Sequence, residues 1–271
     1  MRRARRYGMA LALGWLWTLG LLPAQTKKEQ RGKQVLDEAI AALGGENFLA
    51  LRNRVESGRA YSFYQEKLSG LSRATVYTRY LTPATPPKID EFYLRERQAF
   101  GKDENWAVLF NEEDGWEITF RGARPLRKQT VERFRDNRQR DIFYIVLRRL
   151  GEEGLIIEYR GSDVVDNRPM EIVDITDSRN RVVTVYFHRS TRLPYRQVFF
   201  RRDEHRIRHE EVTVFDKYRD VGAGVAQHLG AAGVVQQREE QVLDGQVGVA
   251  ARQGLAVGRL EGQLQLATDG A

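Results

Sequence analysis

The sequence contains no cysteine, and that absence excludes several kinds of protein. Without a thiol, the chain cannot form a disulfide bond or bind a metal ion through thiolates. It also cannot be a lipoprotein acylated at its own mature N-terminus, because that modification needs a cysteine. A chain without cysteine suits an oxidising compartment, where stray thiols become cross-linked.

Long apolar runs are also missing, except for one near the start of the chain. Four arginines precede an apolar run over residues 8–22, and Leu22-Pro23-Ala24 places a small residue before a cleavage point. This three-part pattern predicts a Sec-type signal peptide over residues 1–24 and a periplasmic or otherwise exported protein. The run is short for a stop-transfer helix of about 20 residues. An uncleaved N-terminal anchor is the alternative.

A strong excess of charge is absent as well. The formal net charge is +7, and the four signal arginines account for more than half of it, which leaves +3 for the mature chain. Arginine and lysine alternate with aspartate and glutamate along the chain, so no basic stripe suited to nucleic acid is expected. A composition of 41% hydrophobic and 30% charged residues is typical of one globular domain.

The end of the chain lacks aromatic residues. After Tyr218 the sequence also contains no lysine, proline, isoleucine, serine or asparagine. Such a shift of composition is typical of a disordered tail. The other interpretation is a reading frame that slips near Val225, so that the last strands are missing. We therefore divide the chain into a signal peptide (1–24), one folded domain (25–225) and a tail (226–271).

Within the domain, apolar spacing predicts two helices. Residues 29–43 carry apolar side chains at helical spacing, and Gly44-Gly45 ends that pattern. The second predicted helix covers Lys128–Leu150. Its first half is polar, whereas Ile142–Leu147 is apolar almost all round. A segment of that kind must be covered on most sides.

The rest of the domain has the alternation of strands. Between residues 55 and 120 the period is two, and Asn111–Gly115 predicts a hairpin turn between two strands. Trp116, Ile118 and Phe120 alternate with polar residues, which indicates a sheet with one covered face. No helices alternate with the later strands, so the sheet is expected to be antiparallel. These later strands are predicted at residues 155–160, 170–175, 182–187, 195–201 and 209–218.

Three motifs in the second half carry a family resemblance. They are Asn167-Arg168-Pro169-Met170 before a strand, the strand pair from Val182 to Gln197, and the stretch from Val214 to Val225. These motifs resemble the LolA/LolB/LppX-like superfamily of lipoprotein carriers and outer-membrane lipoprotein-sorting proteins. His188 and Ala223-Gly224 depart from the pattern, which has acidic residues there, and the strand that follows in the family is missing.

The resemblance implies a mainly β fold with α-helices (α+β). It would be a curved, incompletely closed antiparallel β-barrel with an N-terminal helix and a helical lid. Relatives hold acyl chains in the cavity of this fold. The residues expected to line such a cavity are Phe63, Tyr80, Phe92, Leu94, Trp116, Ile118, Phe120, Val185 and Phe187, with Ile142, Phe143, Ile145 and Val146 facing them from the lid. The alternative is that all of these residues form an ordinary core.

The functional hypothesis is a non-enzymatic, monomeric carrier of lipid or lipoprotein acyl chains, with envelope membrane proteins as further candidate partners. It needs no cofactor or metal ion, and no nucleic acid. A structural or adaptor module of the same fold, without a ligand, is the alternative. A secreted hydrolase is disfavoured because no nucleophile motif occurs. His205 and His209 lack the His-Glu-x-x-His order of zinc hydrolases.

Overall fold

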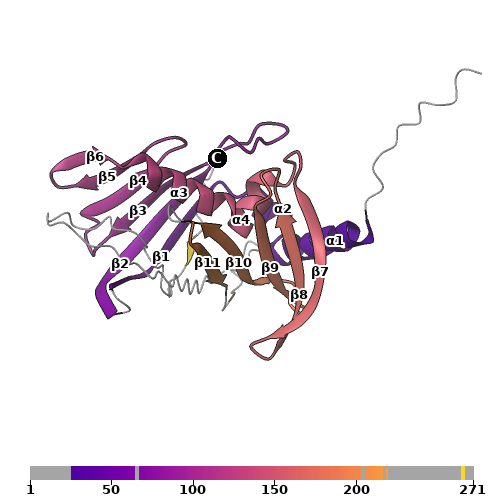
Figure 1. Cartoon of the computed structure of the whole chain (residues 1–271). Helices are drawn as coiled ribbons and strands as arrows, with labels where there is room; N and C mark the ends of the chain where they lie inside the picture. The colour runs from indigo at the N-terminus through magenta and orange to yellow at the C-terminus, as the bar shows by residue number, and fades with distance from the viewer. Residues whose placement is uncertain (1–25, 65–66, 203–205, 216–217, 219–263, 266–271) are drawn as a thin grey trace, which may run out of the picture.

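The computed structural model describes residues 26–64, 67–202, 206–215, 218 and 264–265, without the side chains of residues 62–64, 264 and 265. The predicted signal peptide (1–24) lies outside the described residues, as does all of the predicted tail (226–271) except residues 264–265. The described chain forms two antiparallel sheets and a set of helices (Figure 1).

The first sheet is a meander of the first six strands, with a two-residue strand at one edge. Its order is β12-β1-β2-β3-β4-β5-β6, and each neighbouring pair is antiparallel. The strands are β1 (Asn53–Tyr64), β2 (Lys67–Tyr80), β3 (Leu94–Phe100), β4 (Trp106–Phe110), β5 (Gly115–Thr119), β6 (Gly122–Pro125) and β12 (Leu264–Gln265). The alternation between residues 55 and 120 thus predicted this sheet, except for β6 and β12.

The second sheet is a five-stranded meander in the order β11-β10-β9-β8-β7. Asp166 and Asn167 form the turn between its first two strands, with φ angles of 51° and 59°. Asparagine and aspartate tolerate this left-handed backbone better than most residues. The predicted strands of this half are confirmed as β7 (Ile156–Val165), β8 (Arg168–Thr176), β9 (Val182–His188), β10 (Pro194–Arg202) and β11 (Arg208–Val214).

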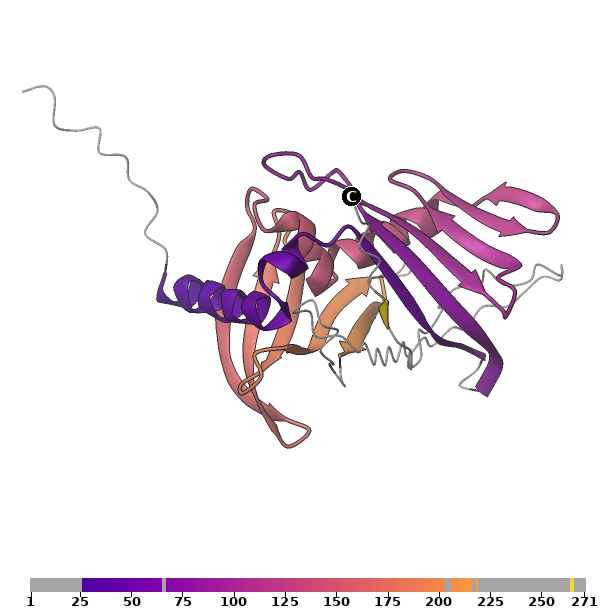
Figure 2. The ribbon, with the colours of Figure 1, turned by 180° about the vertical axis from the view of Figure 1, so that it is seen from behind.

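The N-terminal helix α1 (Lys27–Leu43) packs against β7 and β8, as Figure 2 shows. The hydroxyl of Thr26 accepts a hydrogen bond from the Glu29 backbone N–H and caps the helix. A Cβ atom on Gly32 would lie 2.8 Å from the Ile157 carbonyl oxygen, so glycine allows this close packing. The short helix α2 (Glu46–Leu49) follows and leads into β1.

The segment predicted as one helix over Lys128–Leu150 is divided into three parts. These are α3 (Lys128–Gln139), α4 (Ile142–Tyr144) and the π-helix η1 (Ile145–Arg149). We call α4 and η1 together the plug (residues 142–149). In Figures 1 and 2, α3 lies against the seven-stranded sheet and α4 lies where the two sheets meet. All eight residues of the plug are buried.

The two sheets share no strand pair among the described residues, so they do not close into one barrel. This confirms the predicted fold class, an incompletely closed α+β architecture with an N-terminal helix and an inner helical segment. The large apolar core joins the plug, α1 and the five-stranded sheet. A second and smaller core lies under the outer part of the seven-stranded sheet, around Phe100 and Phe110.

Candidate functional site

The plug begins where the chain leaves α3, at Arg140 and Asp141. The carboxylate of Asp141 accepts hydrogen bonds from the backbone N–H groups of Phe143 and Tyr144, at 3.0 and 3.1 Å. The backbone N–H of Ile142 donates to the side-chain oxygen of Gln197, at 2.9 Å. These bonds satisfy donors that the start of a helix leaves free. The plug is therefore a separate helical unit, and the prediction of one continuous helix is wrong at this point.

The four residues predicted to belong to a lid all lie in the plug. Ile142, Phe143, Ile145 and Val146 are each 5% exposed or less. They share one apolar cluster with five of the predicted lining residues, Tyr80, Phe92, Leu94, Val185 and Phe187. The structure thus brings together nine of the thirteen predicted residues, drawn from both sheets and from the plug.

Aromatic rings form much of this cluster. Phe143 lies edge-on to Phe48 and Phe215, with ring centroids 6.0 and 5.0 Å apart. Phe92 lies 5.5 Å from the Tyr144 ring. The Tyr144 hydroxyl accepts a hydrogen bond from the Tyr93 backbone N–H at 2.8 Å. Edge-on and tilted arrangements are those that aromatic pairs prefer. Phe48, Phe215 and Tyr144 were not predicted for this cluster. Phe48 and Tyr144 lie in helices, where strand alternation gives no signal, and Phe215 lies in a strand predicted over 209–218.

Three predicted lining residues lie elsewhere. Trp116 pairs with Leu109 and Ile118 pairs with Ala107. Strand alternation therefore places both on the face opposite to Val108 and Phe110, which belong to the smaller core. Their expected place on the inner face is wrong, because alternation shows that residues share a face but not which face turns inward.

Phe120 is the third of these residues, and it lies in the turn between β5 and β6. Thr119 pairs with Gly122, so Phe120 and Arg121 form a two-residue turn. The Phe120 side chain is 86% exposed, and its predicted place on the inner face is wrong. Phe63 lies near the end of β1, and its side chain is outside the described residues.

A strip of buried polar groups crosses the inner face of the seven-stranded sheet. Arg54 pairs with Thr78 and Thr78 pairs with Glu96 across three neighbouring strands. The Glu96 carboxylate accepts hydrogen bonds from Arg138 of α3 and from the Gln98 side chain, both at 2.7 Å. The Glu96 side chain is 0% exposed. Burial opposes the charge of Arg138, but the carboxylates of Glu96 and Asp141 raise its pKa overall.

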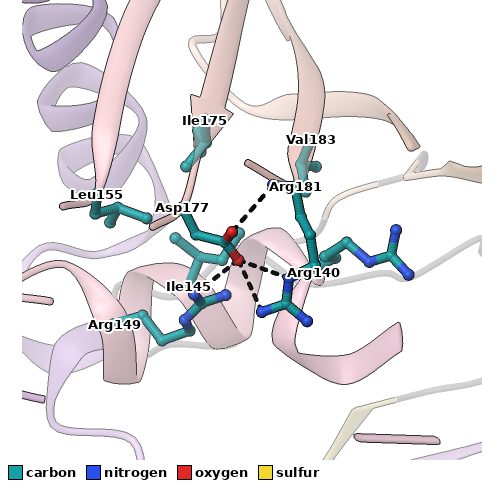
Figure 3. Close-up of a pocket in the computed structure, with 8 residues that line it drawn as sticks. All are labelled: Arg140, Ile145, Arg149, Leu155, Ile175, Asp177, Arg181 and Val183. Carbon is teal, nitrogen blue, oxygen red and sulfur yellow. Dashed lines mark hydrogen bonds and ion pairs between the residues drawn. The ribbon is translucent and has the colours of Figure 1, made fainter. Parts of the chain in front are cut away.

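A second network holds the plug to the turn between β8 and β9 (Figure 3). The Arg149 guanidinium donates to both oxygens of Glu152, at 2.6 and 2.7 Å, and to Asp177 at 3.2 Å. Arg181 donates to Asp177 at 2.9 Å and to Asp136 of α3 at 2.7 Å. Burial opposes ionisation of Asp177, but hydrogen bonds from Arg181 and Arg149 lower its pKa below the ordinary value of 3.8.

The pocket at this second network is closed. Arg140, Arg149, Asp177, Arg181 and four apolar residues line it, and it leaves no room for a water molecule. The three arginines of Figure 3 form ion pairs with Asp177, which is drawn there, and with Asp136 and Glu152 nearby. This pairing suits a contact that fixes helices to a hairpin better than a reacting centre. A search of the described residues finds no group of three or more side chains that could hold a metal ion.

No helix in the described part of the chain combines the length and the apolar character that crossing a bilayer requires. The prediction of export was made from the pattern of residues 1–24. Those residues are outside the described ranges.

Comparisons with known proteins locate the fold among solved structures. No protein-family model matches the chain, and no curated protein matches it. The chain is similar to the structure of a DUF1329 family protein from Desulfovibrio piger, with 10% identity and a TM-score of 0.48, over 74% of this chain and 83% of the other.

Two further likenesses fall in the superfamily that the motifs indicate. A LolA superfamily protein from Nitrosomonas europaea has 12% identity and a TM-score of 0.41, over 73% of this chain and 81% of the other. The lipoprotein LppX from Mycobacterium tuberculosis has 13% identity and a TM-score of 0.28, over 63% of this chain and 88% of the other. The predicted resemblance is confirmed as a likeness of fold, and at these identities and TM-scores it carries no argument about function.

Proposed function

We propose that this chain is an exported, non-enzymatic and monomeric protein that holds acyl chains between its two sheets. The observation that carries the proposal is the plug. It is a helical unit with six apolar residues, 142–147, followed by Arg148 and Arg149; it is separated from α3 by the Asp141 cap and occupies the space between two sheets that do not close. Residues 1–24 supply the export signal in this proposal, and residues 25–225 form the single binding domain.

Beside Ile145 and Arg149, an acyl chain would have to take the place of the plug. The pocket beside the plug leaves no room for a water molecule. Displacement of the plug would uncover Val185, Phe187 and Phe92, which are each 3% exposed or less. Each methylene group that a ligand buries contributes about 0.8 kcal/mol. The burial of one or two acyl chains of ordinary length would therefore offset the apolar contacts that are lost when the plug is displaced.

The polar contacts of the helical segment suit such a movement. Arg138 and Glu96 hold α3 to the seven-stranded sheet, whereas Arg149 holds the plug to the five-stranded sheet through Asp177. Ion pairs are directional and can break and form again. In the proposal they therefore stabilise one closed arrangement of the helices without preventing its opening. In the proposal, loss of the contact between Arg138 and Glu96 favours opening.

The test measures uptake of a fluorescent fatty-acid probe, together with mass spectrometry of lipids that co-purify with the protein from its own envelope. We expect saturable uptake that unlabelled fatty acid competes away. The Glu96→Gln variant should take up the probe faster than the wild type, because its α3 is held less firmly. A matched control is Glu112→Gln, which alters an ion pair with Arg95 at the surface. No co-purifying lipid and no uptake by any variant would contradict the proposal.

A second candidate function is a structural or adaptor module without a ligand. The filled pocket and the ion pairs of Arg138 with Glu96 and of Arg149 with Asp177 favour it. In that case the plug is a permanent part of the core. Glu96→Gln would then lower stability but would give no probe uptake, which distinguishes the two candidates.

A further inference from the structure

The turn between β5 and β6 projects an aromatic ring into solvent. Phe120 and Arg121 form this turn, and Phe120 is 86% exposed, the largest exposed fraction among the large apolar side chains of the described chain. Gly122 follows with a φ of 110°, a left-handed backbone that glycine adopts without strain. All four residues of β6 are exposed as well. The exposed ring therefore lies on the turn of a hairpin, and Figure 1 shows this β5–β6 hairpin at the edge of the sheet.

Four cations lie on this hairpin and directly after it, and acidic residues are absent from the same stretch. Between Glu117 and Glu132 the sequence contains Arg121, Arg124, Arg127 and Lys128, and no aspartate or glutamate. All four cations are exposed. The Arg121 guanidinium lies over the Phe120 ring, 5.2 Å from its centroid. Arg124 contacts Glu117 at 3.2 Å while its side chain stays 80% exposed.

A neighbouring hairpin has the same character. In an antiparallel meander the β1–β2 and β5–β6 connections lie at the same end of the sheet. Near the β1–β2 connection, Leu68 and Leu71 are 57% and 56% exposed, and Lys67 beside them is exposed too. This end of the seven-stranded sheet therefore presents apolar side chains and cations together, on two hairpins.

We propose that the β5–β6 tip, residues 119–128, docks on the surface of an anionic lipid bilayer. Phe120 enters the boundary between headgroups and acyl chains, where aromatic side chains are favoured. The four cations contact lipid phosphates, and such contacts attract basic segments to anionic bilayers. The proposal is independent of the acyl-chain function, because the tip lies outside the core that contains the plug.

A bilayer fits this tip better than a protein partner does. A stable protein interface needs about 800 Å² on each partner, and one ring on a two-residue turn offers far less apolar surface. A bilayer instead accepts a single projecting side chain, whatever the rotation of the protein about the bilayer normal. The concentration of positive charge also matches a surface of uniform negative charge, rather than one carboxylate of a partner.

The absence of cysteine gives a direct experiment on the whole exported protein. Phe120→Cys is labelled with a fluorophore that responds to an apolar environment, and phosphatidylglycerol-containing or pure phosphatidylcholine vesicles are added. We expect a blue shift with the anionic vesicles that high salt reverses. The matched control is Val164→Cys, which labels a 65% exposed apolar position on the β7–β8 hairpin of the other sheet, and it should not shift.

Unlabelled variants measure the affinity by vesicle co-sedimentation. Reversal of two charges, in Arg121→Glu combined with Arg127→Glu, should weaken binding to anionic vesicles by about tenfold or more, since each basic residue near such a surface contributes measurably. Lys33→Glu on α1 reverses one charge, as the single Arg121→Glu variant does, and it should weaken binding much less than that single variant. An equal thermal unfolding midpoint confirms that each variant is folded.

Two results would overturn the membrane proposal. One is a label at position 120 that does not respond to anionic vesicles. The other is an equal loss of binding in Lys33→Glu and in a single Arg121→Glu variant. Uptake of the fatty-acid probe is measured on the same proteins, so failure of the docking tip and failure of the carrier function are distinguished.

Discussion

The inner faces of the two sheets bury different chemistry. The five-stranded sheet turns Val173, Ile175, Val183, Val185 and Phe187 toward the core, each 2% exposed or less. The seven-stranded sheet also buries a strip of charged and polar groups that runs from Arg54 through Thr78 to Glu96. The first inner face is thus mainly apolar, and the second adds polar groups that contact α3.

The largest effect is expected on the apolar side of this comparison. Phe143→Ala removes a ring packed between Phe48 and Phe215 and should lower the free energy of unfolding by about 3–5 kcal/mol. Phe120→Ala makes the same substitution at an exposed turn and should change the free energy of unfolding by less than about 0.5 kcal/mol. Urea denaturation measures both. Similar losses in the two variants would show that the plug is not part of the core.

A smaller but still large effect is expected on the polar side. Glu96→Gln removes the buried carboxylate that Arg138 contacts at 2.7 Å, and breaking such a buried pair costs about 3 kcal/mol. Glu112→Gln changes the exposed pair with Arg95 and should cost less than about 1 kcal/mol. Thermal and urea unfolding of both variants tests the difference. If Glu96→Gln is as stable as the wild type, the polar strip does not hold α3.

The second network predicts a modest dependence on pH. Because the folded protein lowers the pKa of Asp177 below 3.8, this carboxylate stabilises the fold above that pH and loses its contribution as the pH falls through the folded pKa. The stability difference between the wild type and Asp177→Asn should therefore shrink as the pH falls below about pH 4. The exposed Asp163→Asn variant provides the control. A difference that does not change with pH would contradict the assigned ion pairs.

Much of the fold could be predicted because the informative signals are local. Alternation and turn residues located ten of the twelve strands, and the missed β6 and β12 have four and two residues. The break in the second helix also had a local signal, since Asp141 precedes an apolar run as an N-cap does. The apolar character of the plug was equally visible in Ile142–Leu147.

The arrangement of the inner faces could not be predicted in the same way. Register between strands decides that Glu117 rather than Trp116 shares a face with Val108, and no local pattern encodes that choice. Arg54 and Glu56 are spaced like solvent-facing residues of a strand, yet they are 5% and 7% exposed. Arg54 lies near Asp141 and Glu96, which are distant in the sequence, so its burial is a tertiary effect.

Hydrogen exchange of the plug tests the central claim most directly. The backbone amides of residues 142–149 are compared with those of 183–187 in β9, before and after addition of a fatty acid. If the plug moves to admit an acyl chain, its amides should exchange faster than those of β9 in the free protein, and their rates should change when the fatty acid binds. Slow exchange equal to that of β9, unaltered by fatty acid, would contradict the account.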